Sequence, residues 1–256
     1  MDSYCSDINT IFAFVDISHK FHDVVSKHFN SIKDNRYVLL KHVKTKFVFT
    51  YNDNLKRVGE IILATINRVK EQLNKRRLKK PPSDIIKNVY LKLEMTKLIK
   101  EYQGKELSPT DYDYYRNILL NKFPLIELLN DENKLGEFDS TYINQAEEIV
   151  NDKINEFVSF FKNIEKSPKL NPKNVRKNYL EIKDIKKENI LIFTDPDDED
   201  IWLSSEYITY CEDRKILLNF SSTDKNLVSS LNFVVKQNKI KCGKIVFLLS
   251  KYSFSS

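Results

Sequence analysis

The chain has 256 residues, of which 41% are hydrophobic and 30% charged, an ordinary globular balance that is neither disordered nor membranous. Only four residues are glycine, which argues against phosphate-cradling loops, nucleophile elbows and dinucleotide-binding turns, because these need glycine where the backbone approaches a ligand. No stretch reaches the roughly 18 apolar residues of a membrane span, and no secretory signal is evident. Three widely separated cysteines fit no disulfide framework, so we expect a soluble intracellular protein.

The net charge of +6 comes from one segment of the chain. Residues 66–80, INRVKEQLNKRRLKK, hold seven basic residues and one acidic residue, so the rest of the chain sums to about zero. Such a segment can neutralise phosphates without reading sequence, although a solvated helix end explains it at least as well. The candidate nucleic-acid contacts are Arg68, Lys70, Lys75, Arg76, Arg77, Lys79 and Lys80.

The first two-thirds of the chain shows apolar residues at helical spacing. Within it KFVFTY (46–51) alone resembles a strand, but the apolar residues around it step by three or four, which favours one long helix. Pro81 and Pro82 end that helix, and Ser108 is a candidate N-cap for a later one. The predicted helices cover residues 8–32, 36–76, 84–103, 108–123 and 140–164.

The pattern changes at KSPKLNPKN (166–174), where two prolines and several lysines predict a linker over residues 166–177. After it the apolar residues come in short runs of strand length. The predicted strands are 179–182, 190–193, 201–203, 206–209, 215–220 and 244–249, with a helix over 223–235. The predicted fold class is therefore a mainly α helical bundle domain (residues 1–165) followed by a small α+β or β-rich C-terminal domain (residues 178–256).

The acidic segment DPDDED (195–200) places five carboxylates in six residues, and carboxylate oxygens can hold magnesium or calcium. It lacks the alternating carboxylates and the central glycine of an EF-hand loop. A solvated acidic turn is therefore favoured. Metal-dependent hydrolysis by Asp197, Asp198 and Asp200 is the least favoured functional hypothesis.

Other combinations of reactive side chains are weaker. His19 and His22 lie three residues apart on a predicted helix, but no third ligand is suitably spaced nearby, so ordinary partly buried histidines are favoured. The four histidines all precede residue 43, which with the scarcity of glycine argues against a Ser or Cys triad. We predict no catalytic residue, no metal and no cofactor.

Aromatic residues supply a candidate partner interface, because tyrosine buries area while keeping a polar group. Core packing explains two of the three tyrosines at positions 112–115 equally well. The candidate interface residues are Tyr51, Tyr112, Tyr114, Tyr115 and Trp202.

Two stretches of the chain carry a family resemblance. In VLLKHVKTKFVFTYNDNLKRVGEII (38–62) a double leucine and basic residues precede a helix that ends in Tyr, a basic pair and apolar residues, a pattern that resembles the one in GINS subunits. LSPTDYDYYRNILLNKFPLIELL (107–129) is similar to that family's helix with Leu-Ser, two residues, an acid and an aromatic residue. The matching positions are Leu39, Leu40, Lys44, Lys46, Tyr51, Leu55, Arg57, Val58, Leu107, Ser108, Asp111, Tyr114, Tyr115 and Asn117.

The domain order also resembles this family, and most closely its first partner-of-Sld-five subunit, in which a helical A domain precedes a small β-rich B domain. Residues 174–193 and 215–235 are similar to the opening and the close of that B domain. The predicted helix 140–164 and the segment after Ile240 have no place in the pattern, and Thr65 stands where the family has tryptophan.

The resemblance implies a non-catalytic subunit of a nuclear DNA replication complex, a heterotetramer that scaffolds the replicative helicase. Its partners would be sister subunits and helicase or polymerase components, with DNA as a further candidate and no membrane. The alternative is a free-standing nucleic-acid-binding protein that acts through residues 68–80. The broad apolar helix faces also predict exposed apolar surface on the free chain.

Overall fold

The computed structural model describes residues 2–75, 82–102, 109–121, 124–188 and 198–251. The chain divides into two compact units. Unit 1 comprises residues 1–48 and 153–256, and unit 2 comprises residues 49–152. The predicted boundary at residues 166–177 therefore lies inside unit 1, because strands from both ends of the chain share one sheet.

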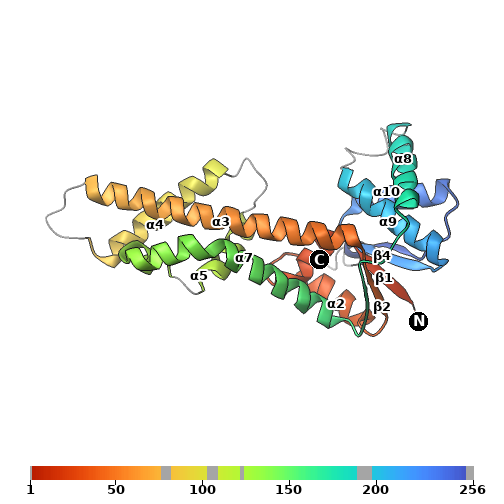
Figure 1. Ribbon diagram of the computed structural model, residues 1–256, viewed down its shortest axis with the longest axis horizontal. Coiled ribbons are helices and arrows are strands. Elements are labelled where there is room, and N and C mark those ends of the chain that lie inside the picture. Colours follow the sequence, from red (N-terminus) through yellow and green to blue (C-terminus); the bar gives the residue numbers. More distant parts are fainter. Residues whose placement is uncertain (1, 76–81, 103–108, 122–123, 189–197, 252–256) are drawn as a thin grey trace. The chain divides into compact units, whose positions relative to one another are not determined.

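Unit 1 is built on a five-stranded parallel sheet with the strand order β3-β2-β1-β4-β5 (Figure 1). Helices connect successive strands. The elements that lie wholly in unit 1 are β1 (Ser3–Ser6), α1 (Ile8–Val15), α2 (His22–Ile32), β2 (Arg36–Leu39), β3 (Asn163–Lys166), α8 (Pro172–Glu188), α9 (Asp198–Arg214), β4 (Leu218–Ser222), α10 (Lys225–Gln237), β5 (Ile245–Phe247) and the 3-10 helix η1 (Leu248–Lys251).

The order of the strands reverses direction at the centre of the sheet. From β1 the chain moves outward to β2 and then β3, and it later crosses to β4 on the other side of β1 and continues outward to β5. Because parallel crossovers are right-handed, the helices after β1 and those before and after β4 cover opposite faces. The chain leaves β1 and its neighbour β4 toward opposite faces of the sheet. Open parallel sheets bind ligands at such a point, next to the carboxyl ends of the two strands.

Aromatic side chains form a large part of the core of unit 1. Tyr37 on β2 stacks on Phe161, with ring centroids 4.1 Å apart, and Phe29 on α2 packs edge-on against both rings. Phe157 contacts the same three rings. All four side chains are buried, so this cluster joins α2, β2 and the C-terminal end of α7.

Unit 2 is a helical bundle. It contains most of α3 (Lys41–Lys75) and α7 (Glu132–Phe160), together with α4 (Asp84–Tyr102), α5 (Pro109–Leu120) and α6 (Leu125–Asn130). The buried residues of α3 recur every three or four positions, which is the period of a helix with one covered face. Within unit 2 the buried apolar residues of α3 are Tyr51, Leu55, Val58, Ile61, Ile62, Ile66 and Val69.

The mainly helical class is confirmed, and several predicted helices are found. The helices expected over 84–103 and 223–235 correspond to α4 and α10, and the long helix expected over 36–76 corresponds to α3 without its first residues. Residues 46–51 are helical, as expected. The predicted helix 140–164 begins earlier, at Glu132, and ends at Phe160. None of the described helices is both long and apolar enough to cross a membrane.

Other predictions were wrong. The single helix expected over 8–32 is two helices, because the carboxylate of Asp16 accepts from the backbone and hydroxyl of Ser18 and forms a turn between them. The strands expected over 179–182, 201–203 and 206–209 are parts of α8 and α9. The β-rich C-terminal domain is therefore an α/β arrangement that the N-terminal strands complete. The strand expected over 190–193 lies outside the described residues.

The cause of these errors is burial on more than one side. In α9 nearly every side chain from Ile201 to Cys211 is buried, so the apolar residues show no helical period. The strands expected over 215–220 and 244–249 correspond to β4 and β5, whereas β1, which has a serine at each end, was not predicted.

A close approach between α3 and α7 inside unit 2 gives a test of this packing. A Cβ atom at Gly59 would overlap the ring of Tyr142, whereas a Cβ at Gly136 on α7 would meet no atom within 4 Å. We expect Gly59→Ala to lower the free energy of unfolding by about 1–3 kcal/mol through overpacking. The control Gly136→Ala should raise it by up to ~1 kcal/mol through helix propensity. Urea denaturation of both variants measures this; equal effects would contradict the packing.

Candidate acidic pocket

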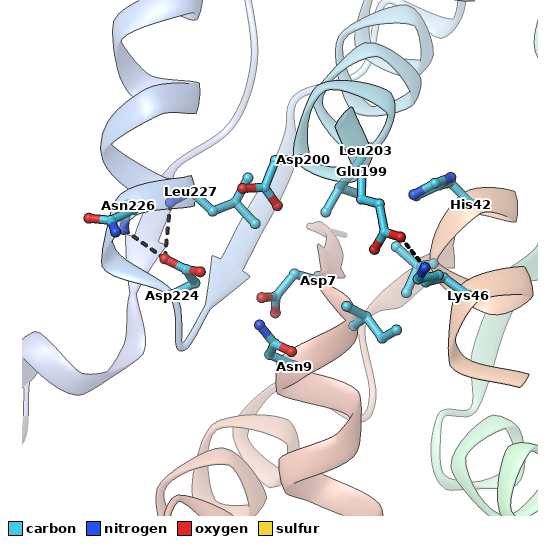
Figure 2. Close-up of a pocket in the computed structure, with 12 residues that line it drawn as sticks. Asp7, Asn9, His42, Lys46, Glu199, Asp200, Leu203, Asp224, Asn226 and Leu227 are labelled. Atoms are coloured by element: carbon cyan, nitrogen blue, oxygen red, sulfur yellow. Dashed lines mark hydrogen bonds and ion pairs between the residues drawn. The ribbon is translucent and has the colours of Figure 1, made fainter. Parts of the chain in front are cut away.

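A pocket of about 340 Å³ lies at the carboxyl ends of β1 and β4, where the strand order reverses (Figure 2). Four different segments of unit 1 contribute to it: the residues after β1, the first turns of α3, the start of α9 and the residues after β4. Its lining residues are Asp7, Ile8, Asn9, His42, Val43, Lys46, Glu199, Asp200, Leu203, Asp224, Asn226 and Leu227.

Asp7 follows directly after β1 and is buried, with 1% of its surface exposed. It is the N-cap of α1, because Oδ1 accepts a hydrogen bond from the backbone N–H of Thr10 at 3.0 Å. Oδ2 accepts from the hydroxyl of Ser222, the last residue of β4, at 2.8 Å. The pKa of Asp7 is raised to about 6, chiefly by burial and to a smaller extent by the charge of Asp224, against the lowering effect of these hydrogen bonds.

Asp224 follows directly after β4 and has the same role at the next helix. Its Oδ1 is the N-cap of α10 and accepts from the backbone N–H groups of Asn226 and Leu227 at 2.7 and 3.1 Å. Its own N–H donates to Ser222 Oγ at 2.8 Å, and Ser222 Oγ donates in turn to Asp7. One serine hydroxyl thus connects the two acidic segments, and both carboxylates face the pocket (Figure 2).

The start of α9 supplies the third side of the pocket. Asp200 and Glu199 line it, and Figure 2 shows the carboxylate of Asp200 above those of Asp7 and Asp224. Asp198, one residue earlier, lies outside the pocket: it accepts from the hydroxyl of Tyr179 at 3.0 Å.

The first turns of α3 supply the positive charge. Lys46 forms an ion pair with Glu199, and His42 lies one turn earlier on the same helix. The start of α3 is held by Glu206 on α9, whose carboxylate accepts from the backbone N–H of His42 at 2.9 Å. Burial raises the pKa of Glu206, and the hydrogen bond from His42 and the charge of Lys41 oppose this.

The side chains that line the pocket offer mainly oxygen atoms, which are the ligands that hard cations prefer. Three aspartates from separate segments, Asp7, Asp200 and Asp224, line one pocket, and the side-chain amides of Asn9 and Asn226 lie beside them. Within the described part of the chain, however, no group of three or more His, Cys, Asp or Glu side chains is placed so that it could hold a metal ion. An ion in this pocket would need water and the phosphates of a substrate as further ligands, as magnesium usually has beside one or two carboxylates.

The predicted nucleic-acid residues belong to unit 2. Among those described, Arg68 pairs with Glu101, Lys70 with Glu132 and Lys75 with Glu71. The remaining four, Arg76, Arg77, Lys79 and Lys80, lie outside the described residues. Each of the three described basic side chains therefore forms an ion pair with an acidic side chain. Ion pairs of this kind are also usual at a solvated helix end, so they do not favour nucleic-acid binding over that explanation.

The predicted interface aromatics are mostly core residues. Tyr51, Tyr112 and Tyr115 are buried, and the hydroxyl of Tyr51 lies 2.8 Å from that of the half-buried Tyr114. Trp202 is half-buried and stacks on Tyr179 with ring centroids 4.4 Å apart. Core packing thus explains three of the four tyrosines.

Sequence reasoning found one of the three aspartates of the pocket. Asp200 was part of the acidic segment, whereas Asp197 lies outside the described residues and Asp198 outside the pocket. Asp7 was missed because β1 was missed, and Asp224 was missed because the pairing of β4 with β1 was not foreseen, although a strand was expected over 215–220. The available signal was an Asp-x-Asn triplet at residues 7–9 and again at residues 224–226.

The raised pKa of Asp7 makes a prediction about stability. The pKa is 3.8 for an ordinary aspartate and about 6 in the folded chain, so folding is favoured by this group below about pH 4 and that contribution is lost as the pH rises through 6. Above pH 7 the cost is on the order of 2–3 kcal/mol. With EDTA present, Asp7→Asn should therefore be more stable than the wild type at pH 8, with a smaller difference at pH 5. Urea denaturation at both values checks this, and equal destabilisation at both would contradict it.

In comparisons with protein families, curated proteins and solved structures, no match to the chain is found. The resemblance to GINS subunits thus stays a prediction. What the chain does has to be argued from the geometry of its own residues.

Proposed function

We propose that unit 1 is a divalent-cation-dependent phosphoester hydrolase and that its substrate class is nucleic acid. The observation that carries the proposal is the meeting of Asp7, Asp200 and Asp224, from three segments far apart in sequence, in one pocket at the reversal point of a parallel sheet. This departs from the prediction of a non-catalytic protein that was made from the sequence.

Two features support a ligand site over a structural acidic cluster. Pockets with converging polar groups at this place in an open parallel sheet are typical binding sites. In addition, Asp7 is kept buried although its ionised form is costly, and carboxylates held at such a cost are concentrated at functional sites. Hydrogen bonds from Thr10 and Ser222 fix the orientation of the Asp7 carboxylate without neutralising it.

The proposed chemistry is the addition of water to phosphorus. The oxygen of water bonds to phosphorus, the ester P–O bond breaks, and the leaving oxygen takes a proton, so one product keeps the phosphate and the other gains a hydroxyl. A bound divalent cation would supply two effects, the polarisation of the phosphate and a lower pKa of the attacking water. The aspartates of this chain would share the cation with water and phosphate oxygens, and without it their charge would repel the substrate.

Nucleic acid is the substrate class that the charge distribution supports. Lys41, Lys44 and Lys46 lie on the first turns of α3, the same turns that contribute His42, Val43 and Lys46 to the pocket. A polyanion with phosphodiester groups matches these positive charges beside the pocket. The sequence-based alternative, nucleic-acid binding through residues 68–80, is compatible with this proposal and stays a prediction.

The test uses the purified chain, end-labelled single-stranded RNA and DNA, and either Mg²⁺ or Mn²⁺. We expect cleavage that EDTA abolishes. Because Asp200 and Asp224 would hold the cation, Asp200→Asn and Asp224→Asn should lower the rate by about 100-fold or more. Asparagine is a good N-cap, so Asp224→Asn keeps the start of α10.

The matched control is Asp198→Asn, which changes a neighbouring aspartate outside the pocket. Its rate should stay close to that of the wild type. Cleavage that persists in EDTA, or that all three variants retain, would come from another source and would overturn the proposal. A wild type that neither binds Mn²⁺ nor cleaves the substrates would also overturn the proposal.

A second proposal, membership of a protein complex, is favoured by a separate surface in unit 2. On α4 the side chains of Ile85, Ile86, Val89 and Leu93 are 78%, 47%, 52% and 53% exposed. These positions lie on one side of the helix, whereas Leu91, Met95 and Leu98 on the other side are buried. An exposed apolar row of this kind suits packing against a helix of another subunit. Assignment to a nuclear replication complex stays a prediction.

This surface can be tested by sedimentation of the free chain over a range of concentrations. We expect concentration-dependent self-association, because nothing else covers the apolar row in a pure sample. Replacing Val89 and Leu93 together by Gln should abolish the association with little change in melting temperature, since both side chains are exposed. Leu180→Gln, at an exposed leucine of α8, is the control and should still associate. A monodisperse wild-type monomer would contradict the proposal.

A further inference from the structure

The three cysteines of the chain, far apart in sequence, meet at one place in unit 1. Cys5 lies on β1, Cys211 on the last turns of α9, and Cys242 on the segment between α10 and β5. The pKa of Tyr207 is raised chiefly by burial and also by the charges of all three, so each lies near this tyrosine. All three are free thiols. Cys5 and Cys211 are buried, whereas Cys242 is partly exposed and lines a further pocket, of about 580 Å³.

The hydroxyl group of Tyr207 joins two of these cysteines. Tyr207 and Cys211 stand four residues apart on α9, so their side chains lie on one face of the helix. The hydroxyl donates to the carbonyl oxygen of Leu218 at 2.7 Å, and the backbone N–H of Gly243 donates to the same oxygen at 3.0 Å. Cys242 precedes Gly243 and is thereby held beside Tyr207.

The sulfur atoms of Cys211 and Cys242 are therefore neighbours. Both are in hydrogen-bonding contact with the hydroxyl of Tyr207. Two sulfur atoms that share one oxygen neighbour need only a small movement to reach bonding distance. Cys242 can supply this movement, because the segment around it, residues 240–244, is neither helix nor strand.

The two thiols differ in how readily an oxidant reaches them. Burial is the main cause that raises the pKa of Cys211 to about 12, with the charge of Cys242 as a smaller cause, against hydrogen bonds from Leu218 and Tyr207. A buried thiol with this pKa stays protonated at neutral pH and is inert towards oxidants in solution. Cys242 faces a pocket, so a small oxidant meets this thiol first.

We propose that Cys242 is a site of oxidation by peroxides and that Cys211 is its resolving partner, so that mild oxidation links α9 to the segment before β5 by a disulfide. The thiolate of Cys242 attacks one oxygen of hydrogen peroxide. An S–O bond forms, the O–O bond breaks, and the departing hydroxide takes a proton, which leaves Cys242 as a sulfenic acid and releases water.

The sulfur of Cys211 then attacks the sulfur of Cys242. The S–S bond forms, the S–O bond breaks, and the proton of Cys211 leaves with the hydroxide as a second water. Two thiols are oxidised and one peroxide is reduced. Cys211 is competent in this step in spite of its raised pKa, because its target is held beside it.

The link would fasten one edge of the sheet. The strand β5 is the end strand, next to β4, and has only three residues, Ile245–Phe247. A disulfide closes a loop from residue 211 to residue 242, which contains both β4 and α10. Disulfides of this kind stabilise a fold mainly by restricting the unfolded chain. The oxidised chain should therefore melt at a higher temperature than the reduced chain. The inference does not depend on the proposed function.

The test treats the purified, reduced chain with hydrogen peroxide, blocks the remaining thiols with an alkylating agent in urea and maps the peptides by mass spectrometry. The wild type should give one linked pair, Cys211 with Cys242, and an alkylated Cys5. Its melting temperature should rise by several degrees on oxidation and return with dithiothreitol.

Three variants separate the two steps. Cys211→Ala should stop at a sulfenic acid on Cys242, which a 1,3-diketone probe traps, because the resolving thiol is gone. Cys242→Ala should keep Cys211 reduced over the same time and show no change in melting temperature with peroxide. Cys5→Ala is the matched control and should still form the link. Circular dichroism of each reduced variant shows whether it is folded, and the wild-type peptide map decides without them.

Several outcomes would overturn the proposal. One is a wild type in which Cys211 and Cys242 both remain alkylated after peroxide. Another is oxidation of Cys242 to a sulfinic acid with no link. A link that involves Cys5, or a link between two chains seen as a dimer on a non-reducing gel, would contradict the assignment of Cys211 as the resolving partner.

Discussion

The junction between β1 and β4 is the constraint on which the rest of unit 1 depends, because it joins residues 215 positions apart in sequence. It consists of the parallel ladder, the contact between the hydroxyls of Ser6 and Ser221 at 2.8 Å, and the hydrogen bond from Ser222 to Asp7. With these contacts the sheet is continuous, and α1 and α10 both begin at its carboxyl edge. The two N-capping aspartates thereby face one pocket.

The same junction explains why a carboxylate is buried there. An asparagine could cap α1 without a charge, and the raised pKa of Asp7 shows that ionisation is costly in the folded chain. A residue that costs stability when nothing is bound suits a site whose ligand supplies the missing positive charge. Stability and ligand binding then oppose each other at one side chain, which is common at functional sites.

The sequence allows the helices of unit 2 to be predicted because each has one buried face. On α3, Leu55, Val58 and Ile62 fall at helical spacing, and the prolines at positions 81 and 82 follow the helix. Such a pattern is local, so it can be read from one stretch of chain.

The strand β1 and its pairing with β4 could not be predicted in this way. The strand β1 reads Ser-Tyr-Cys-Ser, and its serines are acceptable in a core only because strands from distant parts of the chain provide hydrogen-bond partners. Likewise α8 and α9 pack against each other and bury residues that looked like separate strands. The pocket depends on these long-range pairings, so only Asp200, within a conspicuous acidic segment, was visible beforehand.

The interruption of unit 1 by unit 2 has a consequence for biosynthesis. Unit 2 is one continuous segment, so its helices can pack as soon as residue 152 has left the ribosome. The strand β1 is made first but lies between β2 and β4, and its neighbour β4 ends at Ser222. The edge of β1 that pairs with β4 therefore stays unpaired until β4 has been translated. An unpaired strand edge can pair with other chains, so protection by chaperones or rapid elongation would favour correct folding of this topology.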